Sequence, residues 1–158
     1  MKKILPLLIV PIIVFVLIYF LYLRGFGFKT GETSVKEVVT ENGFGFRLEE
    51  VVSDLYVPWS LVFTSKNRAL VTERNGNIRI VSNEKLLEKP LFTFSNMYTE
   101  GEAGLMGLSV DPNYSSNKFI YACLSYNKDG KPRIKVVRLT DNGNSAVAKE
   151  TILDDILA

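Results

Sequence analysis

The chain has 158 residues, of which 47% are apolar, and this length allows one modest folded domain with an appendage. Lys2 and Lys3 account for the formal charge of +2, because the remaining Lys and Arg equal the 17 Asp and Glu in number. This balance gives no electrostatic reason to expect nucleic acid as a partner. The sequence contains no histidine, which excludes a Ser-His-Asp triad, a His-ligated zinc site and an imidazole base within this chain.

Residues 1–23 are the first predicted segment. Residues 4–23, ILPLLIVPIIVFVLIYFLYL, contain no charged side chain. A helix of about twenty residues rises about 30 Å, the thickness of the hydrocarbon core of a bilayer. The run therefore predicts one transmembrane helix, acting as a signal-anchor. A cleaved secretory signal is the alternative, although residues 24–28, RGFGF, lack the small-residue pattern of a cleavage site.

The charges around this run favour an N-terminus inside the cytoplasm, so the rest of the chain is expected outside it, attached to the membrane through residues 4–23. Residues 24–42 mix Gly, Thr, Ser, Glu and Lys without periodicity and are interpreted as a tether. Residues 43–158 then form the folded domain. Its single cysteine, Cys123, is interpreted as a small buried side chain on a strand and precludes an intrachain disulfide.

The folded domain begins with a predicted antiparallel meander. A lead-in strand starts near Phe44, and residues 58–81, PWSLVFTSKNRALVTERNGNIRIV, then contain short apolar runs separated by turn-forming residues. The runs are 59–63, 69–73 and 78–81. Asn75-Gly76 between the last two predicts a type I′ hairpin, because both central residues of that turn need positive φ.

The same pattern recurs later in the chain. Asp129-Gly130 stands where Asn75-Gly76 stood, and three apolar runs surround it as in the first unit. These runs are 107–111, 119–126 and 134–139. Residues 113–117 are expected to form a turn, and residues 150–156 a final outer strand. Two units offset by about fifty residues predict propeller blades, with an ordinary β-sandwich as the alternative.

Three blocks carry a resemblance to a known family. They are VPWSLVFTSKNRALVTERNGNIRIV, EGEAGLMGLSVDPNYSSNKFIYACLSY and VVRLTDNGNSA. In this order and spacing they resemble the N-terminal part of the glucose/sorbosone dehydrogenase family, the soluble-type quinoprotein aldose dehydrogenases. The resemblance covers roughly residues 48–158. It implies an all-β fold, a partial six-bladed β-propeller of about two blades, here preceded by the predicted transmembrane helix.

The resemblance also implies a chemistry, the oxidation of a sugar at its anomeric carbon. Family members use pyrroloquinoline quinone (PQQ) as hydride acceptor, calcium, and a histidine as general base. That histidine is expected just after the counterpart of ILDDI, and the sequence ends at Ala158 before it. The resemblance places the quinone-binding and calcium-binding residues in later blades. No catalytic, cofactor-binding or metal-binding residue is therefore assigned here, and neither PQQ nor calcium is expected to bind this chain alone.

One site residue is carried over from the family. The polar residue before the Gly-Leu-x-Gly block reaches the sugar in similar enzymes, and Glu102 occupies this position. A carboxylate there can accept a hydrogen bond from a sugar hydroxyl. The alternative is that Glu102 lies on a solvated loop without a ligand. Gly101 and Gly104 are expected to serve backbone shape, and Arg74 is interpreted as a solvated strand end.

The predicted function is that of the N-terminal part of a membrane-anchored quinoprotein sugar dehydrogenase, inactive by itself. The resemblance implies a PQQ-dependent aldose dehydrogenase as the enzyme class, with the catalytic histidine and the cofactor-binding blades absent from this chain. A non-catalytic binding module for a glycan or a protein outside the cytoplasm is the first alternative. A piece without stable function is the second, because two blades would leave strand edges open.

Overall fold

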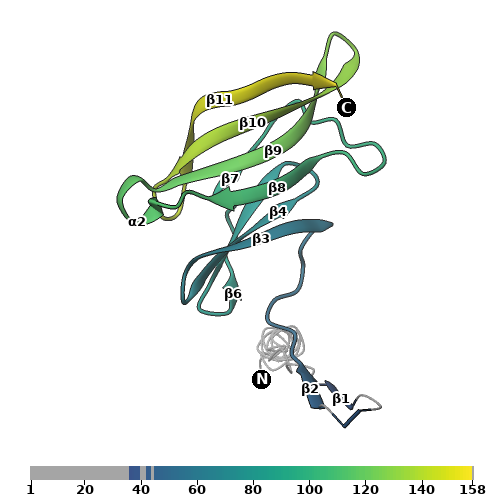
Figure 1. Ribbon diagram of the computed structural model, residues 1–158, viewed down its shortest axis with the longest axis vertical. Helices are drawn as coiled ribbons and strands as arrows, with labels where there is room; N and C mark the ends of the chain where they lie inside the picture. Colours follow the sequence, from purple (N-terminus) through teal and green to yellow (C-terminus); the bar gives the residue numbers. More distant parts are fainter. Residues whose placement is uncertain (1–35, 40–41, 44, 158) are drawn as a thin grey trace, which may run out of the picture. The chain divides into compact units, whose positions relative to one another are not determined.

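The computed structural model describes residues 36–39, 42–43 and 45–157 (Figure 1). The chain divides into two units, Met1–Glu49 and Glu50–Ala158. In the first unit, β1 (Lys36–Val39) pairs antiparallel with β2 (Gly45–Leu48). Part of the predicted tether thus forms a strand. The predicted lead-in strand near Phe44 pairs within this first unit as β2.

The second unit begins with a five-stranded antiparallel sheet. Its first three strands, β3 (Pro58–Ser65), β4 (Arg68–Glu73) and β5 (Asn77–Ser82), pair in chain order, which confirms the predicted meander. The short strands β6 (Lys85–Leu86) and β7 (Phe92–Thr93) both pair with β5.

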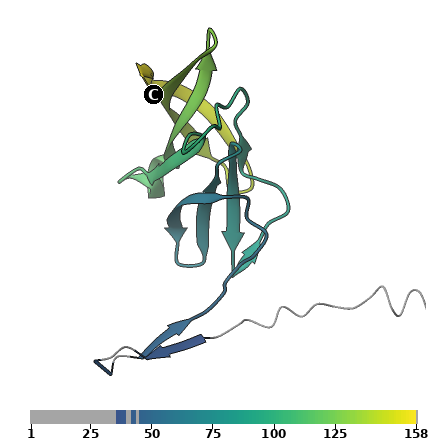
Figure 2. The same cartoon turned by 90° about the vertical axis from the view of Figure 1, so that its right-hand side faces the viewer.

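A four-stranded antiparallel sheet follows. It consists of β8 (Leu105–Val110), β9 (Phe119–Lys128), β10 (Lys131–Asp141) and β11 (Ala146–Leu157), paired in chain order. The predicted final outer strand is confirmed as β11, which lies at the sheet edge. A single helical turn, α2 (Tyr114–Asn117), stands where the sequence predicted a turn. Figures 1 and 2 show this sheet, in green to yellow, as distinct from the blue-to-teal five-stranded sheet.

The two sheets of the second unit share one apolar core. Strands β4, β5, β8, β9 and β10 contribute buried residues to it, and on β5, β9 and β10 these residues alternate, as the period of two in a β-strand requires. Leu70 on β4 and Leu124 on β9 are both fully buried in this cluster. The other fully or nearly fully buried members are Ile78, Ile80, Leu105, Ile120, Ala122 and Leu139. The all-β part of the predicted fold is therefore confirmed.

The two predicted hairpin turns differ in conformation. Asp129 and Gly130 both have positive φ, 51° and 74°, as a type I′ turn requires. At the other hairpin Gly76 alone has positive φ, 108°, and its N–H donates to the Glu73 carbonyl at 2.9 Å. The loop there contains three residues, so the predicted type I′ turn at Asn75-Gly76 is wrong. Three-residue hairpins favour a turn followed by one positive-φ residue, the place that glycine takes here.

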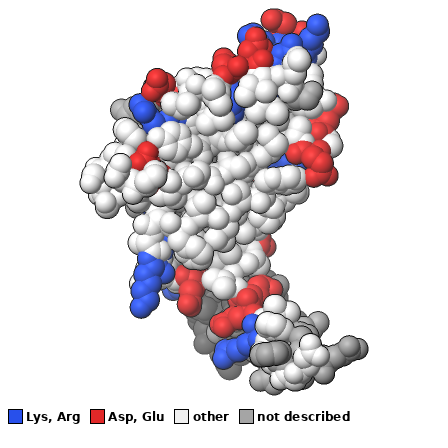
Figure 3. All heavy atoms as spheres, in the orientation of Figure 1, with Lys and Arg blue, Asp and Glu red and all other residues white. Residues whose placement is uncertain are grey.

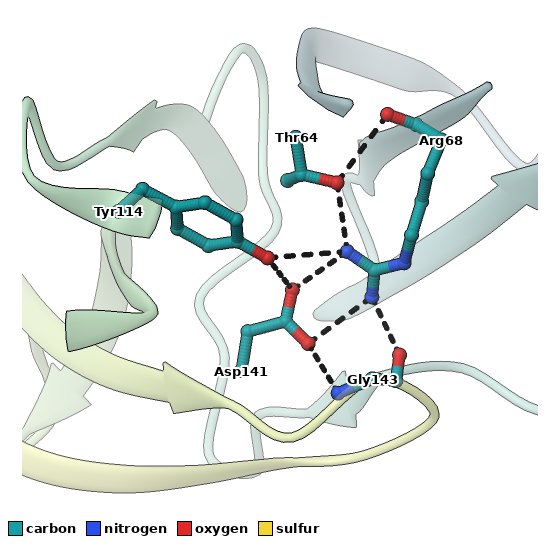
Figure 4. Close-up of polar contacts among 5 residues, drawn as sticks. All are labelled: Thr64, Arg68, Tyr114, Asp141 and Gly143. Carbon is teal, nitrogen blue, oxygen red and sulfur yellow. Dashed lines mark hydrogen bonds and ion pairs between the residues drawn. The ribbon is translucent and has the colours of Figure 1, made fainter. Parts of the chain in front are cut away.

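A polar cluster joins the two sheets at one end (Figure 4). Arg68, at the start of β4, donates from Nη1 to Asp141 Oδ2 at 2.7 Å and from Nη2 to Asp141 Oδ1 at 3.1 Å. The Asp141 carboxylate also accepts from the Tyr114 hydroxyl at 2.6 Å and from the Gly143 N–H at 2.8 Å. Thr64 Oγ1 accepts from Arg68 Nη1 at 2.8 Å. The cluster ties the first sheet to the end of β10.

The second unit carries its charged side chains mainly at the margins of the face drawn in Figure 3, and the middle of that face is uncharged. Several large apolar side chains of this unit are also exposed. Those on β3 are Trp59, Leu61 and Phe63. They line an apolar groove with Val51 and Leu55.

The predicted fold class needs one correction. Within the part of the chain that the structure describes, no helix is long and apolar enough to cross a membrane. The transmembrane helix and the single-pass membrane location predicted from the sequence are therefore withdrawn. The predicted span, residues 4–23, lies outside the described residues. The prediction rested chiefly on hydropathy and length, which say that a run is long enough to span a bilayer and not that it forms a spanning helix.

Candidate functional site

Glu102 lies in the connection between β7 and β8, on the segment 98–104, which we call the Glu102 loop. The Ala103 N–H donates to the Glu100 carbonyl at 3.0 Å and closes a tight turn around Glu102. Gly101 has a φ of 58° in this turn, a conformation that glycine adopts without steric cost. The Glu102 side chain is exposed, and no ion pair of the described residues involves it.

Arg74 holds one side of the Glu102 loop. Its Nη1 donates to the Gly101 carbonyl at 3.0 Å, and its own carbonyl accepts from the Leu105 N–H at 3.1 Å. A Cβ atom on Gly104 would lie 2.5 Å from the Arg74 carbonyl oxygen, so only glycine fits at this approach. Arg74 directly follows β4 and is half-buried, and its guanidinium adds a contact to the loop that the interpretation as a solvated strand end did not include. The prediction that Gly104 serves backbone shape agrees with this contact.

Ser125 on β9 holds the other side. Its side chain is buried, and its Oγ accepts a hydrogen bond from the Gly104 N–H at 2.7 Å. The same hydroxyl donates to the Tyr98 carbonyl at 2.9 Å. The loop that carries Glu102 is thus fixed at both ends.

A second carboxylate lies on the same loop. The Tyr98 hydroxyl donates to Glu100 Oε2 at 3.1 Å, and this hydrogen bond raises the pKa of Tyr98 above its usual value. The loop therefore presents Glu100, already bonded, next to the exposed Glu102. Carboxylates accept hydrogen bonds from hydroxyl groups, so this edge suits a ligand rich in hydroxyls.

The residues around the loop do not fit PQQ or calcium. Among the described residues no group of three or more His, Cys, Asp or Glu is placed to hold a metal ion. PQQ carries three carboxyl groups, whereas only one guanidinium, that of Arg74, bonds to the loop among the described residues. No reaction step is derived through either group.

Comparison with known proteins identifies the family. A model of the glucose/sorbosone dehydrogenase family matches residues 55–157, which includes the whole Glu102 loop. The chain belongs to the glucose/sorbosone dehydrogenase family. An uncharacterized Synechocystis protein is 22% identical over 130 residues, a match that covers 77% of this chain and 32% of that protein.

Solved structures described as glucose or aldose sugar dehydrogenases are similar in fold. An oxidoreductase from Thermus thermophilus, described as a glucose dehydrogenase, is 32% identical, with a TM-score of 0.60, over 80% of this chain and 33% of that chain. A PQQ-bound aldose sugar dehydrogenase from Streptomyces coelicolor is 25% identical, with a TM-score of 0.55, over 80% of this chain and 35% of that one.

The soluble aldose sugar dehydrogenase of Escherichia coli, in its apo form, is 23% identical with a TM-score of 0.60, over 77% of this chain and 33% of that chain. At this identity the likeness shows the fold alone. The chain spans about a third of the length of the relatives that it matches.

Proposed function

We propose that this chain supplies the N-terminal, sugar-contacting part of a dehydrogenase that oxidises aldoses at the anomeric carbon. One observation carries the proposal: Glu102, at the family position that reaches the sugar, is an exposed carboxylate on a loop fixed at both ends. The match of the family to residues 55–157 supports it. A fixed acceptor suits polyol recognition, because the loop need not be ordered when the ligand binds.

In this proposal Glu102 accepts a hydrogen bond from a sugar hydroxyl and orients the ring. Oxidation at the anomeric carbon removes two electrons and two protons from the sugar, and it requires a base and an electron acceptor. The sequence contains no histidine. We therefore assign the base, and the PQQ that is bound in the S. coelicolor relative, to the part of the relatives that this chain does not span. By this assignment the chain alone is inactive.

The test is a titration of the full chain with D-glucose, in which saturation-transfer NMR measures the binding affinity. Glu102→Gln keeps the size of the side chain and removes its charge, so we expect about tenfold weaker glucose binding, the loss of one charge-assisted hydrogen bond. Glu88→Gln is the matched control, because Glu88 is also an exposed carboxylate and lies on another connection. Equal affinities of wild type and Glu102→Gln would contradict the assignment of Glu102.

A second measurement tests whether the base and the cofactor site lie outside this chain, as proposed. The full chain is mixed with PQQ, calcium chloride, an artificial electron acceptor dye and D-glucose. We expect no dye reduction above that of the mixture without protein. Turnover by this chain alone would show that its own residues supply the base and the cofactor site, and would overturn that part of the proposal.

A further inference from the structure

Ser125 makes hydrogen bonds to both ends of the Glu102 loop. At one end the Gly104 N–H donates to Ser125 Oγ at 2.7 Å, and the Ser125 N–H donates to the Gly104 carbonyl at 2.9 Å. At the other end Ser125 Oγ donates to the Tyr98 carbonyl at 2.9 Å, and the Tyr98 N–H donates to the Ser125 carbonyl at 3.1 Å. Ser125 thus bonds to both ends of the Glu102 loop, through its main chain and through its hydroxyl.

The Ser125 hydroxyl adds two side-chain hydrogen bonds to the two main-chain bonds of this closure. A serine hydroxyl carries one hydrogen and two lone pairs, so it can donate to one end of the loop while it accepts from the other. An alanine at this position would keep the two main-chain bonds and lose both side-chain bonds. The Gly104 N–H and the Tyr98 carbonyl would then lack these partners, a cost that favours opening of the loop.

Ser125 is only 1% exposed, so its side chain is out of reach of a sugar in solution. Any effect of its hydroxyl on sugar binding must therefore act through the loop. The opposite side of the loop is held by Arg74 through the Gly101 carbonyl, next to Glu102 itself. Arg74 is less suitable for a test, because its side chain lies close enough to the exposed turn to contact a ligand.

We propose that Ser125 is a positioning residue, which holds the Glu102 carboxylate in a preformed orientation for a sugar hydroxyl. This inference rests on the proposed role of Glu102 as the sugar contact. When the loop is fixed, every molecule is competent to bind. When it is free, the apparent affinity falls in proportion to the competent fraction.

The experiment compares Ser125→Ala with Thr72→Val in the full chain. Thr72 is a matched control, because its buried hydroxyl also accepts from one main-chain N–H, that of Ser60, and donates to one carbonyl, that of Met106. It has no contact with the Glu102 loop among these hydrogen bonds. We expect Ser125→Ala to weaken D-glucose binding about tenfold, as for a loop competent a tenth of the time, and Thr72→Val to leave it unchanged.

Two further readouts separate positioning from general destabilisation. Hydrogen exchange of the peptide that spans the Glu102 loop should accelerate in Ser125→Ala and not in Thr72→Val. In a Glu102→Gln background, Ser125→Ala should cause no further loss of glucose affinity, because the contact that it positions is already absent. If Ser125→Ala does not fold, Ser125→Cys provides a milder change, since a thiol is a weak donor, and an intermediate loss is expected.

The outcomes distinguish the two proposals. If Glu102→Gln binds glucose as wild type does, the proposed function fails at its site. If Glu102→Gln weakens binding and Ser125→Ala does not, the proposed function stands and the role of Ser125 is overturned. Equal losses in Ser125→Ala and Thr72→Val, or an additive loss in the double variant with Glu102→Gln, would also overturn it, because general destabilisation would then explain the effect.

Discussion

Arg68 and Asp141 form an ion pair between residues 73 positions apart in the chain (Figure 4). The Asp141 side chain is 1% exposed and that of Arg68 is 18% exposed, so water screens the pair weakly. A buried pair contributes little relative to an apolar pair, but removal of one partner leaves an uncompensated buried charge. The two sheets can therefore pack at this end only if Arg68 and Asp141 are both present, because either charge alone would be buried without its partner.

Arg68→Met should lower the free energy of unfolding by about 3 kcal/mol, at the low end of the range for a broken buried pair. The low end applies because Tyr114 and Gly143 still donate to the carboxylate. Urea unfolding followed by circular dichroism measures this loss. The control is Lys128→Met, whose partner Asp155 is 52% exposed, and it should lower the free energy of unfolding much less than Arg68→Met does, because solvent screens an exposed pair. Similar losses in the two variants would contradict the argument from burial.

Among the residues of the candidate site, some could be predicted from the sequence and others could not. The blocks around residues 100–108 identified Glu102 as a site candidate, and the structure shows it on an exposed turn. Neither Ser125 nor the contacts of Arg74 could be found from the sequence, since hydrogen bonds between residues 21 or 27 positions apart depend on how strands align. One local signal for Ser125 existed, a hydroxyl inside the otherwise apolar run FIYACLSY. A buried hydroxyl needs a partner, but the run does not say which.

At the scale of elements, the strands were predictable and the turns only partly so. Alternating apolar residues placed β3, β4 and β5 within a few residues of their observed ends, because one face of each strand must be buried. The hairpin at Asp129-Gly130 has the predicted turn. The hairpin at Gly76 does not have the predicted turn. A Cβ there would lie 2.7 Å from the Phe94 carbonyl oxygen, so glycine at this position lets the main chain of Phe94 pack closely against the hairpin.

Gly104→Ala tests whether the loop before β8 packs tightly against the main chain of Arg74. Gly104 has a φ of 144°, and an added Cβ would lie 2.5 Å from the Arg74 carbonyl oxygen, a backbone atom with little freedom to move. We expect a loss of about 3 kcal/mol in the free energy of unfolding, from overpacking and backbone strain together.

Gly101→Ala is the control for this change. Gly101 also has positive φ, 58°, but no heavy atom lies within 4 Å of an added Cβ. Its cost should stay near 1 kcal/mol, roughly that of a left-handed conformation alone. Urea unfolding measures both variants. A Gly104→Ala protein as stable as Gly101→Ala would mean that the approach to Arg74 is not tight in solution.

At the scale of the second unit, the two sheets depend on one another. Leu70 comes from the five-stranded sheet and Leu124 from the four-stranded sheet, and both are fully buried in one cluster. Neither sheet has another partner within the described residues for its inner face. The sequence predicted two repeated units, but periodicity identifies which face of a strand is apolar and not which sheet covers it. The shared core therefore implies that the two sheets unfold together.

Leu70→Ala and Leu124→Ala should each destabilise this common transition by about 3 kcal/mol, the usual cost of a buried Leu→Ala change. Trp59, the only tryptophan, lies on β3, so its fluorescence reports on the five-stranded sheet, whereas circular dichroism reports on both. Leu124→Ala should shift the fluorescence transition as far as the dichroism transition, because a cooperative unit unfolds at one midpoint for every probe. Leu157→Ala, at a side chain 77% exposed, should change stability by no more than about 0.5 kcal/mol. A fluorescence midpoint that Leu124→Ala leaves in place would show that the sheets unfold independently.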